Sequence, residues 1–123
     1  MTRLGLVLAL AVVLTAAVSA HAAAPKASLK VTYWADGPFG QKTTWTLRCG
    51  PAAGTHPAPR LACRTLSLHA AELGPAARAC TLMPKVTSPR ARIKGTWAGR
   101  SVDRTYRIGC PGWRDLRPVL TGK

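Results

Sequence analysis

The sequence is poor in acidic residues and lacks the motifs of common catalytic and metal sites. Eighteen Lys and Arg stand against four Asp and Glu, for a formal net charge of +14. No Ser lies in a Gly-x-Ser-x-Gly turn, which argues against a small serine hydrolase. No two Cys form a close Cys-x-x-Cys pair, which argues against a zinc site that combines them with His56 or His69. We therefore expect no catalytic activity, no metal and no other cofactor.

Long apolar runs are also absent, except for one at the amino terminus. Residues 4–14 form this run behind the single basic residue Arg3, and mostly small residues follow up to position 24. This order is typical of a secretory signal peptide, so we expect residues 1–24 to be removed by cleavage near Ala22–Ala24. An uncleaved membrane anchor is the alternative, but the strongly apolar part is short for a span. The protein is expected to be secreted and extracellular, with no membrane contact after cleavage.

Cysteines supply what a chain of this size needs for stability. About 100 residues remain after the signal peptide, which suits one small domain, residues 25–123, with a modest core. This domain contains an even number of cysteines, namely Cys49, Cys63, Cys80 and Cys110. In an exported chain such a set predicts disulfides, and four cysteines can pair in three ways. In the chain-entropy model, each disulfide that closes a loop of this size adds about 3–3.7 kcal/mol to the free energy of unfolding.

Alternation of apolar residues predicts two β-hairpins. The first joins residues 28–34 to residues 43–49 through the turn-forming segment 36–40. The second joins residues 90–97 to residues 101–108, where Arg104 interrupts the apolar side. The residues expected to share the inner face of the first hairpin are Leu29, Val31, Tyr33, Trp45 and Leu47.

Apolar residues in the middle of the chain are spaced as in a helix. Apolar residues recur at helical intervals from Ala58 to Leu73, which predicts one amphipathic helix over residues 57–72. Thr55 stands at the position of a helix cap, and Gly74-Pro75 ends the helix. The last segment, residues 112–120, has enough apolar residues to pack on the domain.

A short apolar segment between the helix and the second hairpin is the candidate binding loop. It is pinned at one end by a cysteine and consists of Ala79, Cys80, Thr81, Leu82, Met83, Pro84 and Lys85. It follows Gly74-Pro75, which ends the helix, and it precedes the segment up to Pro89 and the second hairpin. We therefore expect an irregular loop whose apolar centre is offered to a partner.

Several motifs around this loop recur together in one known family. They are Thr46-Leu47-Arg48-Cys49, Gly54-Thr55-His56-Pro57, Ala62-Cys63, Cys80-Thr81, the stretch Gly95–Asp103, and Gly109-Cys110 followed by Trp113. In this order they resemble the subtilisin inhibitor-like family of secreted actinobacterial protease inhibitors. The resemblance covers nearly the whole chain after the signal peptide.

The resemblance implies a fold and a set of partners. The implied fold class is α+β, a small two-disulfide domain in which an antiparallel sheet packs against two helices. The implied disulfides are sequential, Cys49–Cys63 and Cys80–Cys110, and the family tends to form homodimers through the sheet. The implied partner is a secreted serine endopeptidase of the subtilisin-like or chymotrypsin-like class. We expect no specific binding of nucleic acid.

The resemblance also implies a reactive bond, which in the family lies two residues past the third cysteine. On this chain that is the bond Leu82–Met83, with Leu82 as the P1 residue that enters the specificity pocket of the protease. A Leu side chain suits the apolar pocket of subtilisin-like and chymotrypsin-like enzymes. The chain is longer than the family pattern between Cys80 and Trp97, so Met83 is the alternative P1 residue. The expected function is inhibition by substrate-like, standard-mechanism binding of this loop.

The high positive charge leaves a second function open. A secreted cationic protein of the same fold could bind anionic surfaces or polymers without inhibiting a protease. This alternative depends on whether the eight basic residues between positions 90 and 117 gather on one face. They are Arg90, Arg92, Lys94, Arg100, Arg104, Arg107, Arg114 and Arg117.

Overall fold

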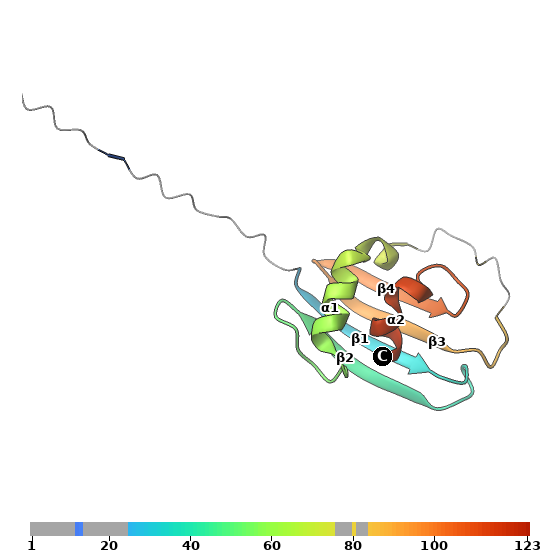
Figure 1. Ribbon diagram of the computed structural model, residues 1–123. Helices are drawn as coiled ribbons and strands as arrows, with labels where there is room; N and C mark the ends of the chain where they lie inside the picture. The colour runs from blue at the N-terminus through green and yellow to red at the C-terminus, as the bar shows by residue number, and fades with distance from the viewer. Residues whose placement is uncertain (1–11, 14–24, 76–79, 81–83) are drawn as a thin grey trace, which may run out of the picture.

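One antiparallel sheet and two helices make up the domain (Figure 1). The computed structural model describes residues 12–13, 25–75, 80 and 84–123, so the predicted signal peptide lies outside the described residues except for Val12 and Val13. The elements are, in chain order, β1 (Ala27–Trp34), β2 (Lys42–Cys49), α1 (Pro59–Leu68), the short 3₁₀ helix η1 (Ala70–Leu73), β3 (Arg90–Trp97), β4 (Arg100–Arg107) and α2 (Trp113–Thr121). The predicted α+β fold class is confirmed.

The sheet has the strand order β2-β1-β3-β4, and all neighbouring pairs are antiparallel. β1 and β2 form the first predicted hairpin, and β3 and β4 form the second. Ala27 on the central strand β1 faces Cys49 on one side and Trp97 on the other, which fixes the register of both pairings. Every second residue of each strand points to the same face, so one face of the sheet is apolar and the other polar.

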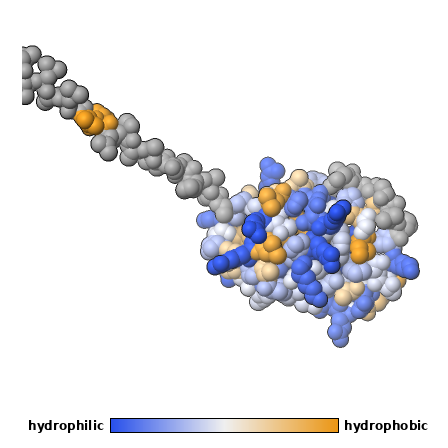
Figure 2. Space-filling model, viewed as in Figure 1, coloured by the Kyte–Doolittle hydropathy of each residue, from blue (hydrophilic) through white to orange (hydrophobic). Residues whose placement is uncertain are grey.

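Both helices cover the apolar face. α1 contacts α2 and β2, and α2 also contacts β1 and β3, so the core lies between the helices and the sheet (Figure 1). Its fully buried side chains include Val31, Leu47, Leu66, Ile93, Leu116, Val119 and Leu120. The carboxyl-terminal segment therefore packs on the domain, as its apolar content predicts. On the visible side of the molecule, hydrophilic and hydrophobic side chains are interspersed (Figure 2).

The single helix predicted over residues 57–72 is wrong in its extent. α1 ends at Leu68, and η1 begins at Ala70. Between them His69 leaves helical geometry, with φ −123° and ψ 34°. The apolar spacing continues through this break, because η1 buries Leu73 against the same core. Periodicity alone therefore does not reveal that the helix stops.

Thr55 does not cap this helix, although its position predicted that role. The cap position belongs to Ala58, which makes no side-chain cap hydrogen bond, and Pro59 opens the helix. Thr55 pairs with Thr46 of β2 instead. The Thr46 amide donates to the Thr55 hydroxyl at 2.9 Å, and the Thr55 amide donates to the Thr46 hydroxyl at 3.1 Å. A Thr hydroxyl serves either purpose, so its partner depends on which amide lies nearer.

The Gly54–Pro57 motif ties β2 to both helices. Gly54 has a φ of +111°, and a Cβ there would collide with the Thr46 carbonyl oxygen, so only Gly allows this close approach. The buried imidazole of His56 accepts a hydrogen bond from the Ala58 amide on Nδ1 at 3.0 Å. Nε2 therefore carries the proton and donates to the Val119 carbonyl of α2 at 2.9 Å. The role of the motif is thus structural: it joins β2, the start of α1 and α2.

Replacement of His56 by Ala is expected to lower the free energy of unfolding by about 2–3 kcal/mol, because it leaves a buried carbonyl and a partly buried amide without their His56 partner. It also removes the edge-to-face contact with Trp45, whose ring centroid lies 5.2 Å away. His69→Ala is the matched control, since the His69 side chain is 39% exposed and only 3.9 Å from the exposed Asp115. That variant should change stability by less than about 0.5 kcal/mol. Urea unfolding measures the stability of both variants. Equal losses would contradict the structural role of His56.

Candidate functional site

The candidate loop is framed by residues that the structure describes on both sides. Ala79, Thr81, Leu82 and Met83, and with them the bond Leu82–Met83, lie outside the described residues. Cys80, Pro84 and Lys85 are described: Cys80 and Lys85 are exposed and Pro84 is half-buried. The site is therefore built from its three attachments, which are the end of η1, the disulfide at Cys80 and the segment 84–89.

The first attachment holds the chain that enters the loop. The hydroxyl of Tyr106 donates to the Glu72 carbonyl oxygen at 2.6 Å. Nη1 of Arg104 donates to the same oxygen at 2.5 Å and to the Gly74 carbonyl oxygen at 3.0 Å. Tyr106 is 1% exposed, and the three hydrogen bonds are partly buried. Arg104, which interrupts the apolar side of its strand, therefore has a structural role, because its guanidinium holds the end of η1.

Tyr106 gives this attachment a pH dependence. Burial raises the pKa of Tyr106 to about 12, the Arg104 cation opposes that rise, and Glu72 adds to it. An unfolded Tyr titrates near 10, so only the folded state keeps this proton between pH 10 and 12. The stabilisation is complete below pH 10 and is lost as the pH rises toward 12.

We expect the free energy of unfolding to fall by up to about 2–3 kcal/mol more in the wild type than in a Tyr106→Phe variant between pH 10 and pH 12. The Phe variant loses the titrating hydroxyl and keeps the ring, so it cancels the contribution of Lys side chains that titrate in the same range. Urea unfolding at pH 8, 10 and 12 tests this expectation. Parallel losses in the two proteins would show that Tyr106 does not titrate differently on unfolding.

The second attachment is the disulfide between Cys80 and Cys110, with a Cα–Cα distance of 4.6 Å. Cys110 lies in the turn between β4 and α2, where its amide donates to the Arg107 carbonyl at 3.0 Å. The Trp113 amide in turn donates to the Cys110 carbonyl at 3.3 Å, which continues the turn into α2. The other disulfide joins Cys49 to Cys63 across β2 and α1. The loop is thus fastened to a turn that two regular elements hold in place.

The third attachment supports the chain that leaves the loop. The Ser88 amide donates to the Lys85 carbonyl at 2.9 Å and forms a turn. Gly37, in the connection between β1 and β2, is buried with a φ of +84°, and a Cβ there would collide with the Val86 carbonyl oxygen. From the sequence, this connection was predicted only as the turn between two strands. Its support of the segment 84–89 depends on a contact between residues far apart in the chain.

These attachments define what the site can do. The described residues on both sides of positions 81–83 are fixed to the domain, through the Cys80–Cys110 disulfide on one side and the segment 84–89 on the other. Among the described residues, no group of three or more His, Cys, Asp or Glu could hold a metal ion. No helix in the described part of the chain is long and apolar enough to cross a membrane.

The fold defines a class of small α+β domains that two disulfides brace. The family model for subtilisin inhibitor-like proteins matches residues 24–109. Because this match spans well over half of the sequence, the chain belongs to the subtilisin inhibitor-like family. Family membership supports protease inhibition as its activity.

A solved structure is also similar. It is the crystal structure of Streptomyces caespitosus sermetstatin in complex with Bacillus licheniformis subtilisin, matched at 24% sequence identity and a TM-score of 0.45. The match covers 78% of this chain and 91% of that chain. No curated protein matches the sequence.

Proposed function

We propose that the protein is a secreted inhibitor of subtilisin-like serine proteases and that its reactive bond is Leu82–Met83. The observation that carries the proposal is the fastening of the loop on both sides of this bond. Arg104 and Tyr106 hold the entering chain, and Cys80 is covalently linked to Cys110 two residues before Leu82. Family membership supplies the class of partner.

The residues of the loop take the positions of a substrate. Leu82 fills the apolar S1 pocket, and Thr81 and Cys80 occupy the positions before it. An extended segment of this kind pairs with the backbone of an enzyme cleft as an added strand does. Pro84 at P2′ has no amide hydrogen, so one backbone hydrogen bond to the enzyme is absent there.

Inhibition rather than digestion follows from the fastening. If the protease cuts the bond, the carboxyl group of Leu82 stays attached through Cys80 to the β4–α2 turn. The new amino group of Met83 stays attached through the segment 84–89 to β3. The two ends remain close, so the peptide bond re-forms faster than the products separate. Turnover is then slow and the complex persists.

Titration of subtilisin with the purified domain, residues 25–123, tests the proposal. Residual hydrolysis of a chromogenic peptide should fall linearly to zero at one inhibitor per enzyme. Trypsin, whose specificity pocket holds a buried acid, should be inhibited far more weakly, because Leu82 does not pair with that acid. Undiminished subtilisin activity at a molar excess of the domain would overturn the proposal.

We further infer that residues 1–24 direct export and are removed. The expected exported species begins within a few residues of Ala22–Ala24, which its intact mass establishes. An exported or membrane-bound species that retained Arg3 would contradict this inference.

A further inference from the structure

The face of the sheet opposite the helices is strongly basic. Its residues alternate with the core-facing residues along all four strands. We call this face the open face. One of its described side chains is acidic, that of Asp103. Seven are basic, namely Lys30, Lys42, Arg48, Arg90, Arg92, Lys94 and Arg107. Half of the eight basic residues between positions 90 and 117 thus gather here, while Arg104 turns to η1 and the others lie elsewhere.

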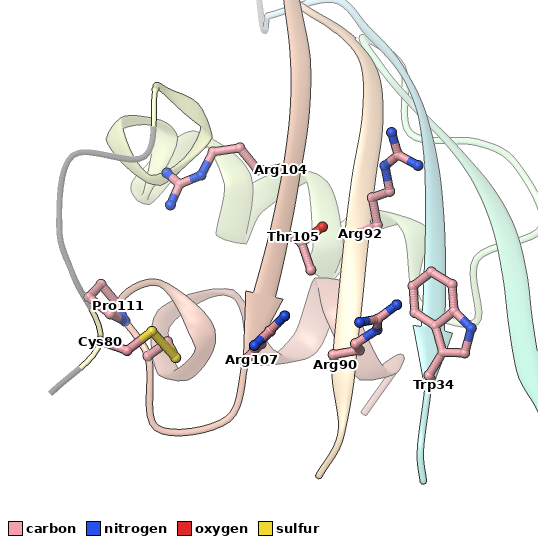
Figure 3. A pocket seen from close by; sticks show the side chains of 9 residues that line it. Trp34, Cys80, Arg90, Arg92, Arg104, Thr105, Arg107 and Pro111 are labelled. Carbon is pink, nitrogen blue, oxygen red and sulfur yellow. A yellow bond between two sulfur atoms is a disulfide. The ribbon is translucent and has the colours of Figure 1, made fainter. Parts of the chain in front are cut away.

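Two hollows on the open face concentrate this charge. The larger, of about 520 Å³, extends from Trp34 past the edge strand β4 to the Cys80–Cys110 disulfide (Figure 3). On the open face it is lined by Arg90, Arg92 and Arg107, and beyond the edge strand it reaches Arg104. The smaller, of about 380 Å³, is lined by Lys30, Arg48 and Lys94 together with Ser28, Leu29 and Thr46. None of the described residues that line either hollow is acidic.

The cations of the larger hollow are only partly compensated within the protein. Arg92 forms a bidentate ion pair with Asp103, with N–O distances of 2.8 and 2.7 Å. Arg90 and Arg107 stand directly opposite each other on β3 and β4 (Figure 3), a placement of like charges that destabilises a sheet. The guanidinium of Arg90 lies 5.0 Å from the centre of the Trp34 ring, which positions it without neutralising it. An oxyanion bound between Arg90 and Arg107 would relieve this repulsion.

We propose that the open face binds a flexible polymer of phosphodiesters. The outward residues of β3, Arg90, Arg92 and Lys94, follow one another at about 6.8 Å, twice the rise of a strand residue. They form a row of cations along which successive phosphates can bind. Arg side chains suit phosphate because their planar guanidinium donates two parallel hydrogen bonds. The hydroxyls of the exposed residues Thr44, Thr96 and Thr105 on the same face add further donors.

Other occupants fit the open face less well. Its one aromatic side chain, Trp34, is covered by the Arg90 guanidinium, so the described face offers no row of free rings on which bases could stack. It exposes no large aliphatic side chain that could enter a lipid bilayer. A second copy of the chain, as in the homodimer that the family resemblance implies, would bring two such faces together and set like charge against like charge.

Binding of a labelled poly(glycerol phosphate) chain, followed by fluorescence anisotropy at 50 and 200 mM salt, tests this proposal. The variant Arg90→Gln/Lys94→Gln/Arg107→Gln removes three cations from the open face. Because it removes three contacts to phosphate, it should weaken binding about 100-fold and flatten the salt dependence. The matched control, Arg60→Gln/Arg64→Gln/Arg117→Gln, has the same net charge but changes exposed residues of the helices, and should weaken binding less than about threefold.

Equal weakening of the two variants would overturn the proposal, because net charge alone would then account for binding. Tighter binding of heparin, of single-stranded DNA or of anionic phospholipid vesicles than of the phosphate polymer would also overturn it, as would a dimer through the open face at low salt in sedimentation. Lys30→Gln/Arg48→Gln/Lys94→Gln changes the other hollow and serves as a second variant if the first unfolds. Its expected loss of binding is also about 100-fold. The proposal does not depend on protease inhibition, which each variant can be assayed for separately.

Discussion

A Cys80→Ser/Cys110→Ser variant is expected to change from an inhibitor of subtilisin into a substrate. Without the disulfide, several residues of the loop must be ordered when the protease binds. Ordering the backbone of one residue costs about 1–2 kcal/mol. Inhibition should therefore weaken at least about 100-fold. Cleavage at Leu82–Met83 should become irreversible, because the carboxyl side of the cut is no longer linked to the β4–α2 turn. Steady-state inhibition assays and the time course of intact mass measure the two effects.

The other disulfide supplies a matched control. In the chain-entropy model, closure of the 30-residue separation between Cys80 and Cys110 contributes about 3.6 kcal/mol. Closure of the 14-residue separation between Cys49 and Cys63 contributes about 3.0 kcal/mol. A Cys49→Ser/Cys63→Ser variant should thus lose nearly as much stability while its loop stays fastened. At a temperature where both variants are folded it should still inhibit. Equal loss of inhibition in the two would contradict a specific role of the disulfide at Cys80.

Replacement of Leu82 by Gly is expected to weaken subtilisin inhibition about 100-fold. Burial of a Leu side chain in an apolar pocket contributes about 1.5–3 kcal/mol, and Gly adds about 0.5–1 kcal/mol of backbone entropy to the cost. Together these amount to about two decades of affinity. Inhibition constants for the purified variants measure the effect. Leu82→Lys should in addition shift inhibition toward trypsin, because a cation then meets the acid of that pocket.

Met83→Gly is the control for the choice of bond. It introduces the same backbone freedom one residue later, so it should cost about tenfold or less if Leu82 is the P1 residue. If Met83→Gly abolished inhibition and Leu82→Gly did not, Met83 would be the residue in the pocket. The reactive bond would then lie one residue further along the chain.

Local patterns predicted the sheet well because strand residues obey a strict period of two. The apolar residues of β1 and β2, including Leu29, Val31 and Leu47, face the core as alternation requires. The end of α1 was predicted wrongly because η1 continues to bury residues at helical intervals. Thr55 was assigned to a cap because its chemistry fits one, whereas the partner it has, Thr46, is nine residues away in the chain.

Contacts between distant residues were outside the reach of the sequence. The two carbonyls that Arg104 binds precede it by 32 and 30 residues, and only an irregularity in the strand pattern pointed to this side chain. The support that Gly37 gives to Val86 left no local signal beyond a glycine in a turn. The basic open face combines residues from both hairpins, so it emerges only when the strand order is known. The reactive bond itself was inferred from one cysteine and a family resemblance, and it stays a prediction.

Intact mass of the domain during incubation with a small amount of subtilisin tests substrate-like inhibition at Leu82–Met83 most directly. The predicted result is a slow approach to a fixed mixture of the uncut form and one form heavier by a single water, whose reduction releases fragments that end at Leu82 and begin at Met83. Starting from the cut form, the same mixture should be reached. Continued digestion into several fragments, or no cut at this bond while the enzyme is inhibited, would contradict it.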